Sequence, residues 1–291
     1  MTTIHIHTTE STDPTQTFAH TAWKENPRLS PSSYRSAQGL TLSKLTYDAR
    51  ISLEHWPQAI ASGCNIILLS ATTAPNLTHK PEGTLAVLET LNPHTIPEGI
   101  DILLTPPNPD AYEPLEQAVK DGHILFYGLT CTGWEDINAH LIMAEAAAHT
   151  VWGRRKRPEL KALMVPFNLA EQHAAREATT THGTEPVSPL ELAARRSMLV
   201  LADRPTLWHG PWGLCDVTDS TNPTALKAQA LLTSRLPAAF NSLPTSVQSW
   251  MVATSMPGIA SATASPQHCH LFQQALEQPD IPDIASILQT P

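Results

Sequence analysis

The fold of this chain is decided by the stretch IDILLTPPNPDAYEPLEQAVKDGHILFYGL, residues 100–129. Its first apolar run, Ile100–Thr105, is typical of a buried strand, and Pro114–Lys120 has the pattern of a helix that Gly122 ends. A second apolar run, Ile124–Gly128, follows directly. A strand, a helix and a second strand in this order predict a unit with two parallel strands.

The same alternation continues on both sides of this stretch. Before it, we expect a half-buried strand, a helix, a buried strand and a second helix at Gly39–Leu45, Glu54–Ser62, Asn65–Ser70 and Gly83–Leu91. After it, we expect two helices, at Asp136–His149 and Leu190–Arg196, and two strands, at Ala162–Phe167 and Met198–Ala202. Strands that alternate with helices over 291 residues predict an α/β barrel of the TIM type.

The order of these motifs resembles the aldo-keto reductase family from about Gly39 to Ile281. In that family an Asp-apolar strand ends in a catalytic His, the next helix ends in Lys-x-Gly, and the following strand ends in Gly-Leu-Ser-Asn. The matching residues are Asp101, Lys120, Gly122, Gly128 and Leu129. Four further segments resemble the Asn-Arg-Pro-Leu of a dehydrogenase-like branch, the closing helix, the eighth strand and the start of the last helix: Asp203–Pro205, Val247–Ala253, Pro257–Ile259 and Pro266–His268.

Two regions depart from the family. The interval from Ser70 to Ile100 has room for one helix and its loops, where the family has two helices and a strand. We therefore expect a degenerate barrel that lacks about one β/α unit or retains it only as His94–Gly99. Residues 1–38 are rich in Thr, Ser, Pro and His, and they predict an irregular N-terminal extension before a barrel domain of residues 39–291.

The resemblance implies that the family's catalytic residues have been replaced. The family uses a Tyr as general acid, a neighbouring Lys and Asp, and a His that orients the substrate carbonyl. The Asp, Tyr and His positions fall on Leu68, Thr73 and Pro106. The Lys ends the strand that we expect to be missing, and we expect Lys80 to be solvated instead. The nearest tyrosines, Tyr47 and Tyr112, belong to other elements.

The resemblance also implies that the NADPH-binding residues have been replaced. Thr130 and Cys131 stand in place of the Ser-Asn pair that holds the nicotinamide amide, and Met164 stands in place of a supporting Gln. Leu271 and Phe272 replace the Glu-Asn pair that faces the adenine. Thr130 keeps a hydroxyl, whereas Met, Leu and Phe supply no comparable donor or acceptor. These replacements predict that the protein binds no cofactor.

Composition restricts the compartment and the class of partner. A net charge of −9 argues against nucleic acid as the main ligand, and we interpret the basic run Gly153–Arg157 as a solvated helix end, with a localisation or anionic-partner patch as the alternative. The four cysteines lack CxxC spacing, which predicts a reducing intracellular compartment, either cytosol or mitochondrion. No apolar run is long enough to predict a membrane span, and no signal peptide is evident.

Paired histidines and clustered tryptophans allow two interpretations each. His5-Ile6-His7 and His268-Cys269-His270 could hold a metal, but pairs are expected by composition among 14 histidines, so we expect no metal site. The segment from Trp208 to Trp212 is either a core anchor or a protein-contact patch. With only 15% charged residues, we expect other protein subunits to bind, through residues 1–38 and through Trp208 and Trp212.

The function that these observations predict is that of a non-catalytic, aldo-keto-reductase-like accessory or structural subunit of a larger multi-protein assembly. A mitochondrial complex is one candidate for that assembly. Two alternatives stay open. One is an NADPH-dependent reductase with relocated catalytic residues, and the other is a sensor that binds a different small molecule in the emptied pocket.

Overall fold

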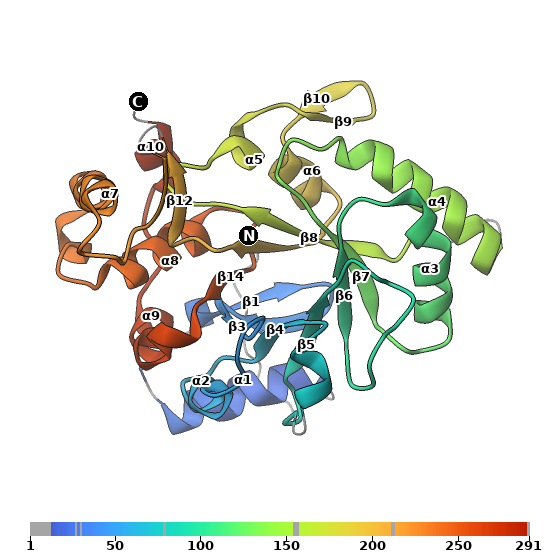
Figure 1. Cartoon of the computed structure of the whole chain (residues 1–291), viewed down its shortest axis with the longest axis horizontal. Coiled ribbons are helices and arrows are strands. Elements are labelled where there is room, and N and C mark those ends of the chain that lie inside the picture. Colours follow the sequence, from blue (N-terminus) through green and yellow to red (C-terminus); the bar gives the residue numbers. More distant parts are fainter. Residues whose placement is uncertain are drawn as a thin grey trace.

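A closed barrel of eight parallel strands forms the centre of the molecule (Figure 1). The computed structural model describes residues 13–26, 28–29, 31–77, 80–153, 157–210 and 213–289. In ring order the barrel strands are β11 (Leu199–Asp203), β14 (Ser261–Ala264), β3 (Leu45–Asp48), β4 (Ile66–Ser70), β5 (Leu85–Glu89), β6 (Ile102–Thr105), β7 (Phe126–Thr130) and β8 (Leu160–Pro166). Pairing of β8 with β11 closes the ring, so the predicted TIM-type fold is confirmed.

Helices and three hairpins surround the barrel. The helices are α1 (Pro14–Glu25), α2 (Trp56–Ala61), α3 (Tyr112–Lys120), α4 (Ile137–Trp152), α5 (His173–Arg176), α6 (Pro189–Arg195), α7 (Pro223–Arg235), α8 (Thr245–Ser255), α9 (Phe272–Glu277) and α10 (Ile284–Gln289). The hairpins pair β1 (Tyr34–Ala37) with β2 (Leu40–Ser43), β9 (Thr180–His182) with β10 (Glu185–Val187), and β12 (Leu207–Gly210) with β13 (Gly213–Asp216). The predicted helices at 136–149 and 190–196 correspond to α4 and α6.

Apolar side chains from alternate strand positions fill the barrel interior. They include Ile66, Leu68, Leu85, Val87, Ile102, Leu104, Phe126, Ala162, Met164, Leu199 and Leu201. The residues between them face a second, outer core beneath the helices. Gly128 has no room for a side chain, because an added Cβ would lie 2.5 Å from Cβ of Ala162. The interior is therefore a packed core, and functional groups are left to the two ends of the barrel.

The segment predicted as a helix at Gly83–Leu91 is strand β5, so this prediction is wrong. β5 pairs with β4 on one side and with β6 on the other. Its side chains alternate between the interior, at Leu85 and Val87, and the outer core, at Ala86 and Leu88. Because both faces are buried, the sequence is continuously apolar, and such a run does not distinguish a strand from a buried helix.

The short interval between Ser70 and Ile100 has lost helices and not a strand. Among the described residues, only the 3-10 turn η2 (Ala74–Asn76) stands between β4 and β5, and only turns stand between β5 and β6. The prediction of an incomplete β/α repeat therefore holds for the helices, whereas the prediction of a missing strand is wrong. The segment 94–99 lies in the loop between β5 and β6. The strand predicted at 39–45 corresponds to β2. No separate strand was predicted for β3, the first barrel strand.

The described residues between 13 and 38 are packed on the barrel and are not irregular, as Figure 1 shows for α1. The Oγ1 of Thr15 in α1 accepts a hydrogen bond from the backbone N of Thr41 (2.9 Å). The hydroxyl of Tyr34 in β1 donates to the carbonyl of Gly63 (2.9 Å). Within the described residues, this segment is thus part of the folded unit. Residues 1–12 lie outside the described part.

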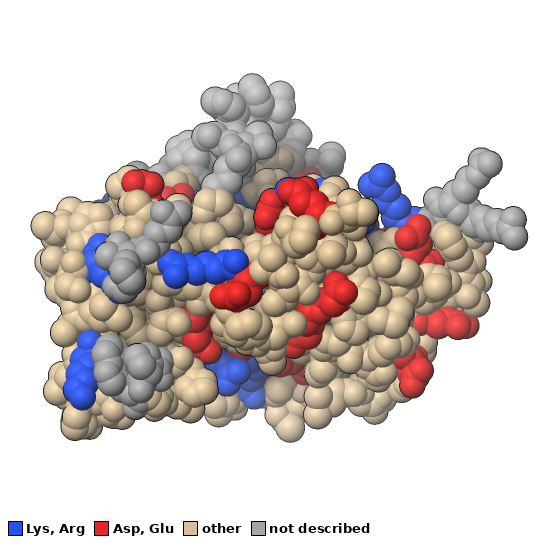
Figure 2. Space-filling view, turned by 90° about the horizontal axis from the view of Figure 1, so that it is seen from above, with Lys and Arg blue, Asp and Glu red and all other residues tan. Residues whose placement is uncertain are grey.

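The surface is poor in charge. Figure 2 shows a face on which most residues are neither Lys, Arg, Asp nor Glu, as expected from a chain with 15% charged residues. In the part of the chain that the structure describes, no helix has the length and apolarity needed to cross a membrane.

Candidate functional site

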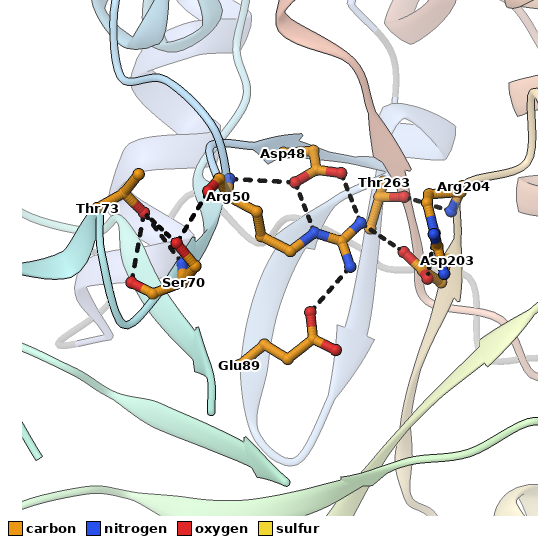
Figure 3. Close-up of polar contacts among 8 residues, drawn as sticks. All are labelled: Asp48, Arg50, Ser70, Thr73, Glu89, Asp203, Arg204 and Thr263. Atoms are coloured by element: carbon orange, nitrogen blue, oxygen red, sulfur yellow. Dashed lines mark hydrogen bonds and ion pairs between the residues drawn. The ribbon is translucent and has the colours of Figure 1, made fainter. Parts of the chain in front are cut away.

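Charged side chains meet at the barrel mouth, which we define as the rim formed by the carboxyl ends of the barrel strands. Arg50, two residues beyond β3, reaches across this rim (Figure 3). Its guanidinium donates to Asp48 from Nε (2.8 Å) and Nη2 (2.6 Å), to Asp203 from Nη2 (2.7 Å) and to Glu89 from Nη1 (2.9 Å). Arg204 Nε also donates to Asp203 (2.8 Å). We call these five residues the Arg50 cluster.

The strand pattern directs the three carboxylates of the Arg50 cluster into the mouth. Asp48, Glu89 and Asp203 are the last residues of β3, β5 and β11. Because strand side chains alternate, Glu89 shares the inward direction of Val87, and Asp203 shares that of Leu201. The apolar interior therefore ends in a layer of charge.

The Arg50 cluster is partly withdrawn from water. The side chains of Arg50 and Asp48 are each 17% exposed, and that of Asp203 is 7% exposed. Burial alone would lower the pKa of Arg50, but its hydrogen bonds to Asp48 and the nearby charge of Asp203 raise that pKa above its ordinary value. Three carboxylates against two guanidiniums leave one net negative charge in the Arg50 cluster.

Hydroxyl groups fix the backbone around the Arg50 cluster (Figure 3). Ser70 Oγ donates to the carbonyl of Arg50 (2.8 Å), and the backbone N of Ser70 donates to Thr73 Oγ1 (3.0 Å). On the other side, the backbone N of Arg204 donates to Thr263 Oγ1 (2.6 Å). The ends of β3, β4, β11 and β14 are thereby held together.

The positions that the resemblance assigns to catalysis lie at or below this mouth. Leu68 is fully buried in the barrel interior, and Pro106 directly follows β6. Thr73 is buried and bonded to Ser70 in the turn after β4. None of these three side chains carries a group that titrates near neutral pH.

The third strand exists, so the position at its end has an occupant, contrary to our expectation. That strand is β5, and it ends at Glu89, a carboxylate where the family has an amine. Lys80 lies elsewhere: its Nζ donates to Asp101 Oδ2 (2.7 Å), at the opposite end of β6. Lys80 is therefore paired and does not reach the mouth.

All four tyrosines of the chain are described, and each has its hydroxyl bonded outside the barrel interior. Tyr47 OH donates to the carbonyl of Ser52 (3.2 Å), and Tyr112 OH is bonded to His140 Nδ1 (2.8 Å). Tyr127 OH donates to Glu116 Oε1 (3.0 Å), and Tyr34 is bonded to Gly63 as described above. Burial raises the pKa of all four phenols, which makes them poor proton donors.

The positions that the resemblance assigns to the cofactor are mostly apolar and packed. Met164 is part of the barrel interior, and Phe272 packs edge-on against Trp250 (ring centroids 5.5 Å apart). Cys131 is buried, which raises the pKa of its thiol. Thr130 ends β7 at the mouth, and Leu271 ends the 3-10 turn η5 (Pro266–Leu271).

The described residues of the histidine and tryptophan segments have structural roles. His268 packs edge-on against Trp250 (6.2 Å), and among the described residues no group of three or more His, Cys, Asp or Glu side chains is arranged to hold a metal ion. Trp208 is buried, and its Nε1 donates to the carbonyl of Pro205 (3.0 Å), so it is a core anchor and not a contact patch. His5, His7 and Trp212 lie outside the described residues.

Comparison with solved structures finds the same architecture in aldo-keto reductases. The structural neighbours include the glycerol dehydrogenase of Gluconobacter oxydans (12% identity, TM-score 0.62) and a holo aldo-keto reductase of Bacillus halodurans (13%, 0.59). Both alignments cover 88% of this chain and 95% of the other chain. An aldo-keto reductase of Klebsiella pneumoniae in complex with NADP and acetate aligns over 88% of this chain and 94% of its own (12%, 0.59). The chain therefore has the aldo-keto reductase fold.

Comparison by sequence finds no such relationship. No family model matches the chain, and no curated protein matches it. The likeness to the reductases thus lies in the fold, at identities too low to transfer a function.

Sequence reasoning missed the Arg50 cluster. The available signal was a charged residue directly after an apolar run, at Asp48, Glu89 and Asp203. In the sequence, Asp203 resembles part of a family motif and nothing more. The helix expected at 83–91 hides the place of Glu89 at the end of a barrel strand.

Proposed function

We propose that this chain is a non-catalytic barrel of the aldo-keto reductase type that serves as an accessory or structural subunit of a larger protein assembly. The observation that carries the proposal is the Arg50 cluster. It fills with paired charges the end of the barrel at which this fold places its active sites. The side chains at the corresponding family positions, Leu68, Thr73, Glu89 and Pro106, supply no proton donor of the family's kind.

The chemistry of carbonyl reduction supports this proposal. Hydride transfer to a carbonyl needs an acid that delivers a proton to the oxygen in the transition state. Tyr47, Tyr112 and Tyr127 belong to the outer core and not to the barrel interior, and burial raises the pKa of each. A mouth with excess carboxylate also repels the pyrophosphate of a dinucleotide, since like charges at close range disfavour binding. The unpaired cysteines fit an intracellular assembly.

The test is a titration of the purified full-length chain with NADPH, followed by calorimetry and by quenching of tryptophan fluorescence. We expect no saturable binding at NADPH concentrations up to about 1 mM. A dissociation constant of that size corresponds to a binding free energy of only roughly 4 kcal/mol. With a panel of aldehydes and ketones, NADPH oxidation should equal that of a heat-inactivated sample. Saturable binding with turnover would instead identify a reductase with relocated residues, and binding without turnover would identify a sensor.

A further inference from the structure

Several large apolar side chains of this molecule remain exposed. Among the described residues, the large apolar side chains that remain exposed are Ile51, Leu91, Leu125, Trp134, Ile142, Leu214 and Leu226. Four of them stand in the part of a connection that directly follows the carboxyl end of a barrel strand, before any helix. Ile51 follows β3, Leu91 follows β5, Trp134 follows β7 and Leu214 follows β11. We call these four residues the apolar rim.

The apolar rim follows the order of the strands. The ring runs β11, β14, β3, β4, β5, β6, β7, β8, so every second strand leads, before any helix, to one exposed apolar side chain. Strands two apart in a ring are about 10 Å from each other. The strands that lead to the rim residues are therefore spread around the ring.

Two of these side chains are almost uncovered by the described part of the chain. Ile51 is 93% exposed and Leu91 is 86% exposed. Ile51 follows Arg50 directly and Leu91 lies two residues after Glu89, and Arg50 and Glu89 form an ion pair of 2.9 Å. Exposed apolar groups of this kind, grouped around one feature, mark interaction sites more often than scattered ones do.

Trp134 is held in position for contact. Its ring is stacked on that of His173, with centroids 4.8 Å apart and planes within 6°. A ring nitrogen of His173 is bonded to the carbonyl of Thr132, and Glu135 accepts from the backbone N of both Thr132 (2.8 Å) and Gly133 (2.9 Å). A fixed aromatic ring loses little conformational entropy when a partner covers it, which favours tight contact.

The charge inside the apolar rim defines what the partner must present. The Arg50 cluster carries one more carboxylate than guanidinium, and the Glu89 side chain is 30% exposed. We propose that the barrel mouth is a protein-docking surface whose partner places a Lys or Arg side chain, surrounded by apolar residues, beside Glu89. This inference rests on the proposed function, since a working reductase needs the same mouth open for its cofactor.

The excess negative charge of the Arg50 cluster favours a protein partner with a cation over two other occupants, a second copy of the chain and nucleic acid. A second copy of the chain docked mouth to mouth would bring two carboxylate-rich clusters together, and like charges across an interface are costly. Nucleic acid would meet the same repulsion, because its affinity comes mainly from contacts of cations with phosphates.

The experiment places a photo-crosslinking amino acid in the full-length protein, in cells that naturally make it. The test positions are Ile51 and Leu91, and the matched controls are two other exposed residues, Leu125, which precedes β7 at the opposite end of the barrel, and Ile142, which lies within helix α4. We expect both test positions to crosslink to the same protein and the controls to give no such product. The crosslinked partner peptide should contain a Lys or Arg between apolar residues.

A binding measurement completes the test. A synthetic peptide with the crosslinked sequence should bind the Ile51→Ser, Leu91→Ser variant at least about tenfold more weakly than wild type, as loss of central apolar contacts predicts. The Leu125→Ser, Ile142→Ser variant should stay within about twofold of wild type. Replacing the partner's cation by Gln should weaken binding as well.

Several results would overturn the proposal. These are equal crosslinking from control positions, no crosslink from the mouth, a crosslink to a second copy, and a partner peptide without a cation. None of these results depends on NADPH. A negative crosslinking result with no NADPH binding would reject the docking surface alone, whereas NADPH turnover would reject the non-catalytic function by itself.

Discussion

A single arginine organises the mouth of this barrel. Arg50 contacts carboxylates from three strands, and no neutral side chain of similar length could satisfy Asp48, Glu89 and Asp203 together. When one member of a partly buried ion network is removed, the remaining charges stay desolvated and unpaired, which is more harmful than loss of the attraction itself. The stability of the mouth therefore depends on Arg50 more than on any one carboxylate.

Arg50→Met should lower the free energy of unfolding by about 3 kcal/mol, because it leaves three neighbouring carboxylates without their central cation. Arg204→Met is the matched control, since the Arg204 side chain is 57% exposed and contacts only Asp203 within the Arg50 cluster. We expect that variant to lose less than about 1 kcal/mol. Urea denaturation at neutral pH measures the free energy of unfolding of both variants. Equal losses in the two variants would contradict the central role of Arg50.

A second charged residue, Lys44, gives the fold a pH dependence. Lys44 is buried, its Nζ donates to the carbonyl of Gln278 (2.7 Å), and burial lowers its pKa to about 8 despite the opposing charge of Asp280. The unfolded chain retains the ordinary amine pKa of 10.5. Between about pH 8 and pH 10 the unfolded state therefore binds more protons than the folded state, and the contribution of Lys44 to stability rises with pH.

Comparison of wild type with Lys44→Met isolates this effect. The difference in free energy of unfolding between the two proteins should shift in favour of wild type by about 2 kcal/mol from pH 8 to pH 10. Burial also raises the pKa of Cys64 to about 11, which works in the opposite direction, but that thiol is present in both proteins and cancels. A difference that stays constant with pH would show that Lys44 keeps its ordinary pKa.

At the scale of elements, the sequence predicted the regular units and failed where a helix was absent. The helices α4 and α6 have flanking signals in the sequence, such as Asp136, whose carboxylate caps α4. β5 had no such signal, because burial on both faces removes the alternation that identifies a strand. The Arg50 cluster was equally hidden, since its residues are brought together only by the ring order of β3, β5 and β11.

The entry to β5 allows a test of how α1 is held. Gly83 has a φ of +79°, and a Cβ there would lie 2.3 Å from the carbonyl oxygen of Pro14 in α1. Gly99 has a similar φ of +83° but nothing within 4 Å of its Cβ position. Both Gly→Ala changes strain the backbone by about 1–2 kcal/mol, and only Gly83→Ala adds a clash with α1.

We therefore expect Gly83→Ala to destabilise the protein by about 2 kcal/mol more than Gly99→Ala, as overpacking typically does. Thermal unfolding followed by circular dichroism compares the two variants directly. Hydrogen exchange of the α1 amides should be faster in Gly83→Ala alone. Identical behaviour of both variants would mean that α1 does not depend on its contact with Gly83.

At the scale of the whole molecule, the barrel keeps its strands where it has lost helices. A ring of strands has no free edge only if every member is present, so deletion of one strand would leave two unpaired edges. A helix on the outside can be replaced by loops, provided that the outer side chains stay covered. Ala86 and Leu88 of β5 remain buried. The short interval between Ser70 and Ile100 predicted that part of a β/α unit was missing. Its length alone could not distinguish loss of a strand from loss of helices.

The N-terminal segment belongs to this same closed unit, which reverses what its composition suggested. Leu29 and Tyr34 are buried, and both lie 3.0 Å from the position that a Cβ on Gly63 would occupy. Ala19 of α1 is buried as well. A large apolar side chain contributes about 2 kcal/mol when buried, and the net stability of a domain is only about 5–15 kcal/mol. Removal of residues 1–35 should therefore be severe.

We expect the chain that starts at residue 36 to unfold at least roughly 10 °C below the full-length protein or to aggregate on expression. Leu29→Ala in the full-length protein isolates one of the lost contacts and should lower the free energy of unfolding by about 3 kcal/mol, as large-to-small changes in cores do. Leu125→Ala is the control, because Leu125 is 50% exposed and should change stability by less than about 1 kcal/mol. A truncated chain that melts like wild type would show that the barrel is complete without residues 13–35, and the segment would again be free to bind a partner.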